Sequence, residues 1–245
     1  MDEKENCSWG KLSSDWDNVT EIIVYGFGAA AEVYFKNLHK KVKVRFIIDN
    51  SEKLKGKICE EVPIYSFEEA KKKIGKTKLV IMTETLRYSQ ISKDLQENGY
   101  IENRDFTGLE RFICEWFMRH FQQTCLMEIH MAITTKCVFN CKNCNMFIPY
   151  YKNRQVMSLN EMKNNFDILF QYVDYVFKYQ IVGGEPFLNR DLPDFLQYIY
   201  ERYKDRVGRI RIITNGGVLP SEKLLHTIKE CGVEVNVSNY LNEID

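Results

Sequence analysis

Short apolar segments with strand character alternate with amphipathic segments along this chain of 245 residues. The first half contains three such strand runs, "EIIVYG" at 21–26, "KVRFIIDN" at 43–50 and "KLVIMTE" at 78–84, separated by helical patterns. A second alternation contributes "MEIHMAITT", "YVFKYQIV", "RIRIIT" and "VEVNVS" between residues 127 and 238. Strands joined by helices pair in parallel, because each helix returns the chain to the same end of the sheet. The sequence therefore predicts an α/β protein with parallel sheets.

The alternation divides into two halves. We expect a Rossmann-like module over residues 1–106 and an amphipathic connecting helix over 107–124, "TGLERFICEWFMRHFQQT". A second α/β domain is expected over 125–245, with four strands each following a βα pattern. Within it, Ser158 and Glu161 are spaced as a capping box at the start of a helix.

Charge and composition exclude several classes of function. Lys plus Arg and Asp plus Glu number 34 each, so no net field attracts nucleic acid or an anionic membrane. The N-terminus "MDEKENCSWG" is acidic and lacks the apolar core of a signal peptide, and the apolar run at 22–31 is too short to cross a bilayer. We therefore expect a cytoplasmic protein, in which clustered cysteines indicate metal or redox chemistry more than disulfides.

Three of the eight cysteines lie within "CVFNCKNC", directly after a predicted strand. Cys137, Cys141 and Cys144 have the spacing C-x3-C-x2-C, which lets one loop surround a soft metal centre with thiolates. Chance produces this spacing in about one comparable sequence in a hundred. The cluster is therefore a strong candidate when other positions support it.

Zinc and an iron–sulfur cluster are the two metal hypotheses. A structural zinc site needs a fourth Cys or His, and the nearest candidates, Cys125 and His130, lie before or within the preceding strand. Neither completes a second knuckle. An iron–sulfur cluster can instead leave one iron open for a ligand that is not protein, which suits a catalytic centre.

Glycine and polar residues end the later strands of this half. "GGEP" places Gly183, Gly184 and Glu185 after one strand, where glycines let backbone approach a ligand and a carboxylate can accept hydrogen bonds from an ammonium group. "TNG" and "VSN" end the next two strands. Ligands of parallel sheets collect at these carboxyl ends, although each motif is also ordinary turn chemistry.

The cysteine spacing and "GGEP" together resemble the radical SAM enzymes, over about residues 126–240. The resemblance implies the first part of a partial (β/α) barrel. It also implies that Cys137, Cys141 and Cys144 bind a 4Fe–4S cluster, whose open iron is chelated by S-adenosylmethionine (SAM). Reductive cleavage of SAM would give a 5′-deoxyadenosyl radical that abstracts a substrate hydrogen. One departure is Asn143, where many members carry an aromatic residue before the third cysteine.

The resemblance also implies roles for single residues and partners. The implied SAM contacts are Gly183, Gly184, Glu185, Thr214, Asn215, Ser238 and Asn239. Glu128 and His130 would face the barrel interior, where we expect His130 to be a satisfied core histidine rather than a catalytic one. An electron donor such as flavodoxin or ferredoxin is implied, together with a small-molecule substrate that the family alone does not identify.

The first half carries its own glycine turn, "GFGAAA". Gly26 and Gly28 follow a strand and Asp49 ends the next one, which matches a dinucleotide fingerprint with a carboxylate for a ribose hydroxyl. With "DNSEKLKG", this half resembles small Rossmann-like modules attached to sugar-modifying acyltransferases and methyltransferases. That resemblance implies either nucleotide or nucleotide-sugar binding or a purely structural role, and it suggests a carbohydrate or nucleotide-sugar substrate.

Four strands are fewer than the six that the family's barrels usually have. Either the chain is part of a longer one or the remaining wall comes from elsewhere, and a truncated barrel would hold the cluster without shielding the substrate. Two other hypotheses stay open: a zinc-stabilised interaction module, and a nucleotide-sugar binding protein with a vestigial second half.

Overall fold

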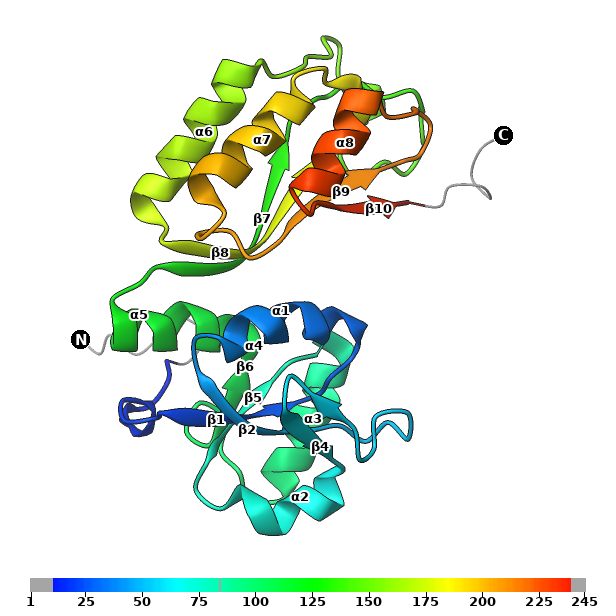
Figure 1. Cartoon of the computed structure of the whole chain (residues 1–245). Helices are drawn as coiled ribbons and strands as arrows, with labels where there is room; N and C mark the ends of the chain where they lie inside the picture. Colours follow the sequence, from blue (N-terminus) through cyan, green and yellow to red (C-terminus); the bar gives the residue numbers. More distant parts are fainter. Residues whose placement is uncertain (1–10, 84, 239–245) are drawn as a thin grey trace, which may run out of the picture. The chain divides into compact units, whose positions relative to one another are not determined.

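The computed structural model describes residues 11–83 and 85–238 and divides into two compact units, Met1–Gln123 and Thr124–Asp245 (Figure 1). Each unit has its own sheet and its own cluster of buried apolar side chains. Among the described helices, none is both long enough and apolar enough to span a membrane.

The first unit is built on a six-stranded sheet in the order β3-β4-β2-β1-β5-β6. Its ladders are parallel except for the short antiparallel pair of β3 and β4. The strands are β1 (Glu21–Tyr25), β2 (Lys43–Ile48), β3 (Ile58–Cys59), β4 (Val62–Tyr65), β5 (Lys78–Ile81) and β6 (Phe106–Gly108). The helical segments are η1 (Ser14–Trp16), α1 (Ala29–His39), α2 (Phe67–Ile74), α3 (Thr85–Glu97), α4 (Leu109–Arg111), η2 (Phe112–Trp116) and α5 (Phe117–Phe121).

Helices cover both faces of this sheet. Ile23 and Tyr25 of β1 pack with Phe67 and Ile74 of α2 and with Leu95 of α3, all buried in one cluster. Figure 1 shows α1 on the opposite face of the sheet from α2. Because both faces are covered, the central strands carry the nearly continuous apolar runs that the sequence shows.

The connecting helix of the first unit is present but shorter than predicted. The predicted helix over 107–124 begins at Leu109 and ends at Phe121, because Phe106–Gly108 pairs with β5 as a sixth strand. The helical run contains a π segment, η2, and Phe112 in it packs against Trp16 of the same unit, with ring centroids 5.9 Å apart. Between β2 and α2, the chain also forms the short hairpin of β3 and β4.

The second unit has a four-stranded, fully parallel sheet in the order β10-β9-β8-β7, which confirms the predicted α/β architecture. Its strands are β7 (Cys125–Ala132), β8 (Tyr175–Val182), β9 (Ile210–Thr214) and β10 (Glu234–Val237). Its helical segments are η3 (Ile148–Tyr150), α6 (Leu159–Tyr172), η4 (Pro186–Leu188), α7 (Leu192–Tyr203) and α8 (Glu222–Glu230). The predicted capping box of Ser158 and Glu161 starts α6.

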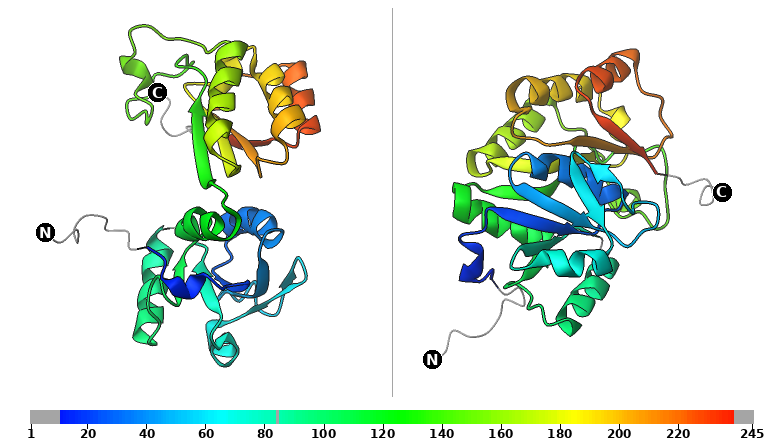
Figure 2. Two further views of the ribbon diagram at one scale, coloured as in Figure 1. Left: turned by 90° about the vertical axis from the view of Figure 1, so that its left-hand side faces the viewer. Right: turned by 60° about the horizontal axis from the view of Figure 1, so that its bottom comes forward.

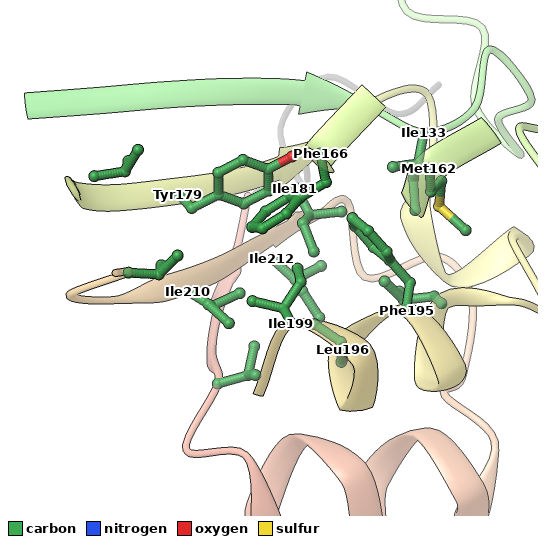
Figure 3. Packing of buried hydrophobic residues seen from close by; sticks show 14 of the residues in the cluster. Ile133, Met162, Phe166, Tyr179, Ile181, Phe195, Leu196, Ile199, Ile210 and Ile212 are labelled. Carbon is green, nitrogen blue, oxygen red and sulfur yellow. The ribbon is translucent and has the colours of Figure 1, made fainter. Parts of the chain in front are cut away.

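The three long helices of this unit cover one face of its sheet (Figures 1 and 2). Figure 3 shows Tyr179 and Ile181 of β8 packing toward Phe166 of α6 and Phe195 of α7, and all four side chains are buried in one cluster. Alternation along each strand sends the intervening side chains to the other face. The carboxyl ends of the strands meet at one edge of the sheet, where the predicted motifs lie.

Candidate functional site

The cysteine loop follows β7 after a short extended segment. Thr134 forms an isolated bridge with Val156, so the residues between them make a closed excursion from the sheet edge. Cys137, Cys141 and Cys144 all lie in this excursion, and each is partly exposed. The loop thus presents three thiols together at the carboxyl end of the sheet.

Cys137 contacts the motifs that follow β8 and β9. Its pKa is raised, first by burial and then by the charges of Glu185, Cys141 and Cys144, while the Phe139 N–H, 3.4 Å from the sulfur, opposes the shift. A Cβ on Gly184 would lie 3.0 Å from the Cys137 Cβ, so this cysteine borders the glycine pair after β8. Three cysteines in one loop supply the soft sulfur donors that suit an iron–sulfur cluster.

The glycine pair after β8 is packed directly on the start of the cysteine loop. The Gly184 N–H donates to the Thr134 carbonyl at 2.9 Å, and the Glu185 N–H donates to the Lys136 carbonyl at 2.8 Å. A Cβ on Gly184 would lie 2.2 Å from the Lys136 oxygen. Gly183 has φ +146°, and a Cβ there would lie 2.4 Å from the Thr134 oxygen. The two motifs therefore join through backbone, and only glycine fits.

Glu185 is fully buried beneath this junction. Its carboxylate accepts hydrogen bonds from the Thr214 hydroxyl at 2.8 and 2.9 Å, from the Asn215 N–H at 2.8 Å and from the Phe187 N–H at 3.0 Å. The carboxylate therefore ties the end of β9 to the loop after β8. Its predicted contact with the amino group of SAM stays a prediction.

Asn215 connects the third motif to the cysteines. Its side-chain amide nitrogen donates to the Cys137 sulfur at 3.2 Å, and its side-chain oxygen accepts from the Gly217 N–H at 2.8 Å. A Cβ on Gly217 would lie 2.7 Å from Val138 and 2.9 Å from Phe139. Sequence reasoning missed Gly217, although the second glycine of "TNGG" repeats the signal of the glycine pair after β8.

The fourth motif reaches the site only in part. Ser238 follows β10, is half-buried, and its N–H donates to the Thr214 carbonyl at 2.8 Å. Asn239 lies outside the described residues. The SAM contacts of Thr214, Asn215, Ser238 and Asn239 stay predictions.

Within residues 11–83 and 85–238, no three His, Cys, Asp or Glu side chains are arranged as a formed metal site. The three cysteines therefore stay predicted ligands. Their fit to a cluster rests on the donor chemistry, since three thiols lie in one loop.

The glycine turn of the first unit is built differently. Gly26 has φ +91°, and a Cβ there would lie 2.1 Å from the Thr83 methyl group. Asp49 accepts the Phe27 N–H at 2.7 Å and the Ser51 N–H at 2.8 Å. Gly28 caps α1 without a side-chain hydrogen bond, and a Cβ there would have nothing within 4 Å. Gly26, Gly28 and Asp49 lie together, and their predicted nucleotide role stays a prediction.

His130 is not the satisfied core histidine that the sequence suggested. Its side chain is 53% exposed and its Nε2 contacts the Glu128 carboxylate. As strand alternation predicts, this side chain lies on the face away from the helices. At this position, apolar side chains do not cover that face, so the histidine is exposed.

Two family models match this chain, one in each unit. Residues 131–239 match the family described as "Radical SAM superfamily", and residues 18–106 match the family "C2185-like, N-terminal". A probable GTP 3′,8-cyclase of Methanococcus aeolicus is 30% identical over 119 residues, 46% of this chain and 37% of the relative. An S-adenosylmethionine-dependent nucleotide dehydratase of Selenomonas ruminantium is 30% identical over 98 residues, 40% of this chain and 33% of the relative.

The chain thus spans about a third of the length of these curated relatives. Among solved structures, BtrN in complex with AdoMet and 2-DOIA is similar with 28% sequence identity and a TM-score of 0.36. The similarity covers 45% of this chain and 44% of that one.

Proposed function

Because its second unit makes this chain a member of the radical SAM superfamily, we propose that it catalyses a radical SAM reaction on a small, nucleotide-related molecule. The cofactors of this domain are a 4Fe–4S cluster and SAM. When bound, they supply a radical that abstracts a hydrogen atom from the substrate.

The observation that carries this proposal is the junction of three motifs at one edge of the sheet. Asn215 donates its backbone N–H to Glu185 and its side-chain amide to the Cys137 sulfur. Motifs far apart in sequence are thereby fixed against one another by direct hydrogen bonds. A catalytic centre needs such positioning, because small displacements of reacting groups lower the rate steeply.

The residues of the junction have distinct tasks in this proposal. Cys137, Cys141 and Cys144 hold the cluster, and the backbone of Gly183 and Gly184 borders SAM. Glu185 acts from below as a positioning residue, because its buried carboxylate fixes the ends of β8 and β9 relative to each other. The Asn215 amide donates to one thiol and so orients it.

Two further parts of the proposal concern organisation and substrate. We assign the radical chemistry to residues 125–245 and nucleotide or nucleotide-sugar binding to the module over 1–106. The names of the two relatives, a GTP cyclase and a nucleotide dehydratase, support a nucleotide-related substrate. An electron donor such as flavodoxin or ferredoxin is the expected protein partner.

Anaerobic reconstitution with iron and sulfide tests the proposal. We expect about four irons per chain, and 5′-deoxyadenosine after addition of dithionite and SAM. The Cys137, Cys141 and Cys144 triple Ala variant should lose both, whereas a Cys59→Ala, Cys231→Ala variant, altered at two partly exposed cysteines outside the loop, should keep both.

Equal iron in the triple variant and the wild type would overturn the proposal. One zinc and no iron per chain would support the zinc module instead.

A further inference from the structure

A row of polar side chains crosses all four strands of the second sheet. His130 of β7 is in register with Gln180 of β8, Gln180 with Arg211 of β9, and Arg211 with Glu234 of β10. The residues flanking this row on β7, β8 and β9 pack in the apolar core beneath the helices, as Tyr179 and Ile181 do on β8. By strand alternation the row lies on the face away from the helices.

A second set of charges extends this row on β7 and β8. The Glu128 carboxylate contacts the Lys178 ammonium, the His130 ring and the Gln180 amide. Burial opposes ionisation of Glu128, but the hydrogen bonds from Lys178 and His130 prevail and lower its pKa. Glu128 is therefore an ionised carboxylate that orients its three neighbours rather than a free acceptor.

The opposite end of the row has a surplus of cations. Arg209 and Arg211 both contact the single carboxylate of Glu234, Arg211 at 3.3 Å. Across the face, three permanent cations (Lys178, Arg209 and Arg211) therefore accompany two carboxylates. Since both carboxylates are already engaged, the face has hydrogen-bond donors and positive charge to offer a ligand.

An apolar band separates this row from the cofactor loops. Two residues further along the strands, Ala132 is in register with Val182, and Ile213 with Asn236. The first three of these side chains are apolar, and each of the four is at least partly exposed. Two residues of strand span about 7 Å. A ligand that extends from the row across the apolar band would therefore approach the cysteine loop.

We propose that this row recognises a phosphate group of the substrate, with His130 and Arg211 as the contacting residues and Glu128, Gln180 and Glu234 as their supports. His130 is the most exposed charged or polar partner, at 53%, and Arg211 is 25% exposed. The carbon skeleton lies on the Ala132 and Val182 band, which places a C–H bond at the cofactor edge. This assignment rests on the proposed function and gives its substrate a class: a phosphorylated molecule.

Binding measurements with defined probes test the row. Isothermal titration calorimetry measures the binding of GTP, glucose 1-phosphate and guanosine to the chain, before and after the cluster is loaded. We expect one or both phosphorylated probes to bind and guanosine to bind at least tenfold more weakly. His130→Ala and Arg211→Gln should each weaken binding about tenfold, or about 1.4 kcal/mol, because each removes a charge-assisted hydrogen bond to the phosphate. Arg211→Lys should retain part of the affinity.

Matched controls lie on the helices of the same unit. His226 of α8 contacts Glu230 at 3.2 Å and is 71% exposed, so His226→Ala removes a similar pair from a helix. Arg202→Gln changes an exposed arginine of α7. Both variants should bind the phosphorylated probes like the wild type, and GTP compared with glucose 1-phosphate separates a nucleotide from a sugar phosphate.

Two results would overturn the proposal that the row recognises a phosphate group. In one, neither phosphorylated probe binds better than guanosine. In the other, His130→Ala and Arg211→Gln bind like the wild type, as they would if the probe bound only at the turn of the first unit. Loss of cluster assembly with intact, row-dependent binding would instead overturn the proposed radical chemistry, because binding is measured without the cluster as well.

Discussion

Each unit carries a glycine turn after a parallel strand and a carboxylate close to it, but the turns are held in different ways. In the second unit, Gly183 and Gly184 press against the backbone of the cysteine loop, and Glu185 is buried beneath them. In the first unit, Gly26 alone is crowded, while the Cβ position of Gly28 is open. Asp49 there is only partly buried.

The difference shows that two similar glycine motifs can have different physical causes. The glycines at 183 and 184 are required by contact within the chain itself, whatever ligand binds. Among the described residues, no atom lies within 4 Å of a Cβ at position 28, so the start of α1 or the approach of a ligand is the remaining reason for glycine there. Equivalent substitutions in the two turns distinguish a glycine required by packing from one that packing does not require.

We expect the largest difference in stability between the Gly184→Ala and Gly28→Ala variants. Gly184→Ala places a methyl group 2.2 Å from the Lys136 oxygen and must part the two loops. We expect it to destabilise the junction by about 3 kcal/mol or more, from overpacking and lost backbone hydrogen bonds. Gly28→Ala meets no atom within 4 Å and should change stability by less than about 1 kcal/mol.

Hydrogen exchange of the full chain reports both effects, since peptides from each unit are read separately. Faster exchange is expected at Thr134–Cys137 and Gly183–Glu185 in the Gly184→Ala variant. Equal exchange in the two variants would show that the glycine pair of the second unit is not held by packing.

Neutralising the two carboxylates gives the next largest difference. Glu185→Gln puts an amide NH₂ among the N–H donors of Phe187 and Asn215 in a fully buried site. We expect a loss of about 3 kcal/mol, because a buried donor is left unpaired. Asp49 accepts a hydrogen bond at each oxygen and is partly exposed, so we expect Asp49→Asn to cost about 1 kcal/mol.

Local exchange of β9 and of the turn at 26–28 measures these losses. Glu185→Asp serves as the control that keeps the charge and shortens the reach. A Glu185→Gln variant as stable as the wild type would mean that the carboxylate does not hold the junction.

Much of the fold was predictable because hydrophobic period is a local property. The strand runs and the capping box at Ser158 lie where periodicity and cap chemistry place them. The strand β6 was missed because Phe106–Gly108 gains strand structure only by pairing with β5. Three residues carry too little pattern to be recognised alone.

The sequence suggests members of the candidate site but not their contacts. Spacing makes Cys137 and the glycine pair candidates, but the hydrogen bond from Asn215 to the Cys137 sulfur depends on how β7, β8 and β9 are ordered. Likewise, the row from His130 to Glu234 follows from the register between neighbouring strands, which the sequence alone does not specify. The residues that sequence reasoning misjudged, His130 and Gly217, both depend on neighbours from other strands.

The smallest expected effect concerns a feature that the two units share. Each has a Ser–Glu capping box, Ser66 with Glu69 at α2 and Ser158 with Glu161 at α6. In both, hydrogen bonds from the serine backbone N–H and hydroxyl lower the pKa of the glutamate. A carboxyl whose pKa is lowered by folding stabilises the helix above its unfolded pKa, and that stabilisation is lost as pH falls through the folded value.

Carboxyl carbon shifts measured by NMR during an acid titration test this similarity. Glu69 and Glu161 should both titrate below the ordinary glutamate value of about 4.3. Ser66→Ala and Ser158→Ala should each raise the midpoint of their own partner alone, because each box is local to one helix. Ordinary midpoints in the wild type would show that the boxes do not persist in solution. A lowered midpoint in only one unit would mean that the difference between the units extends to their helix ends.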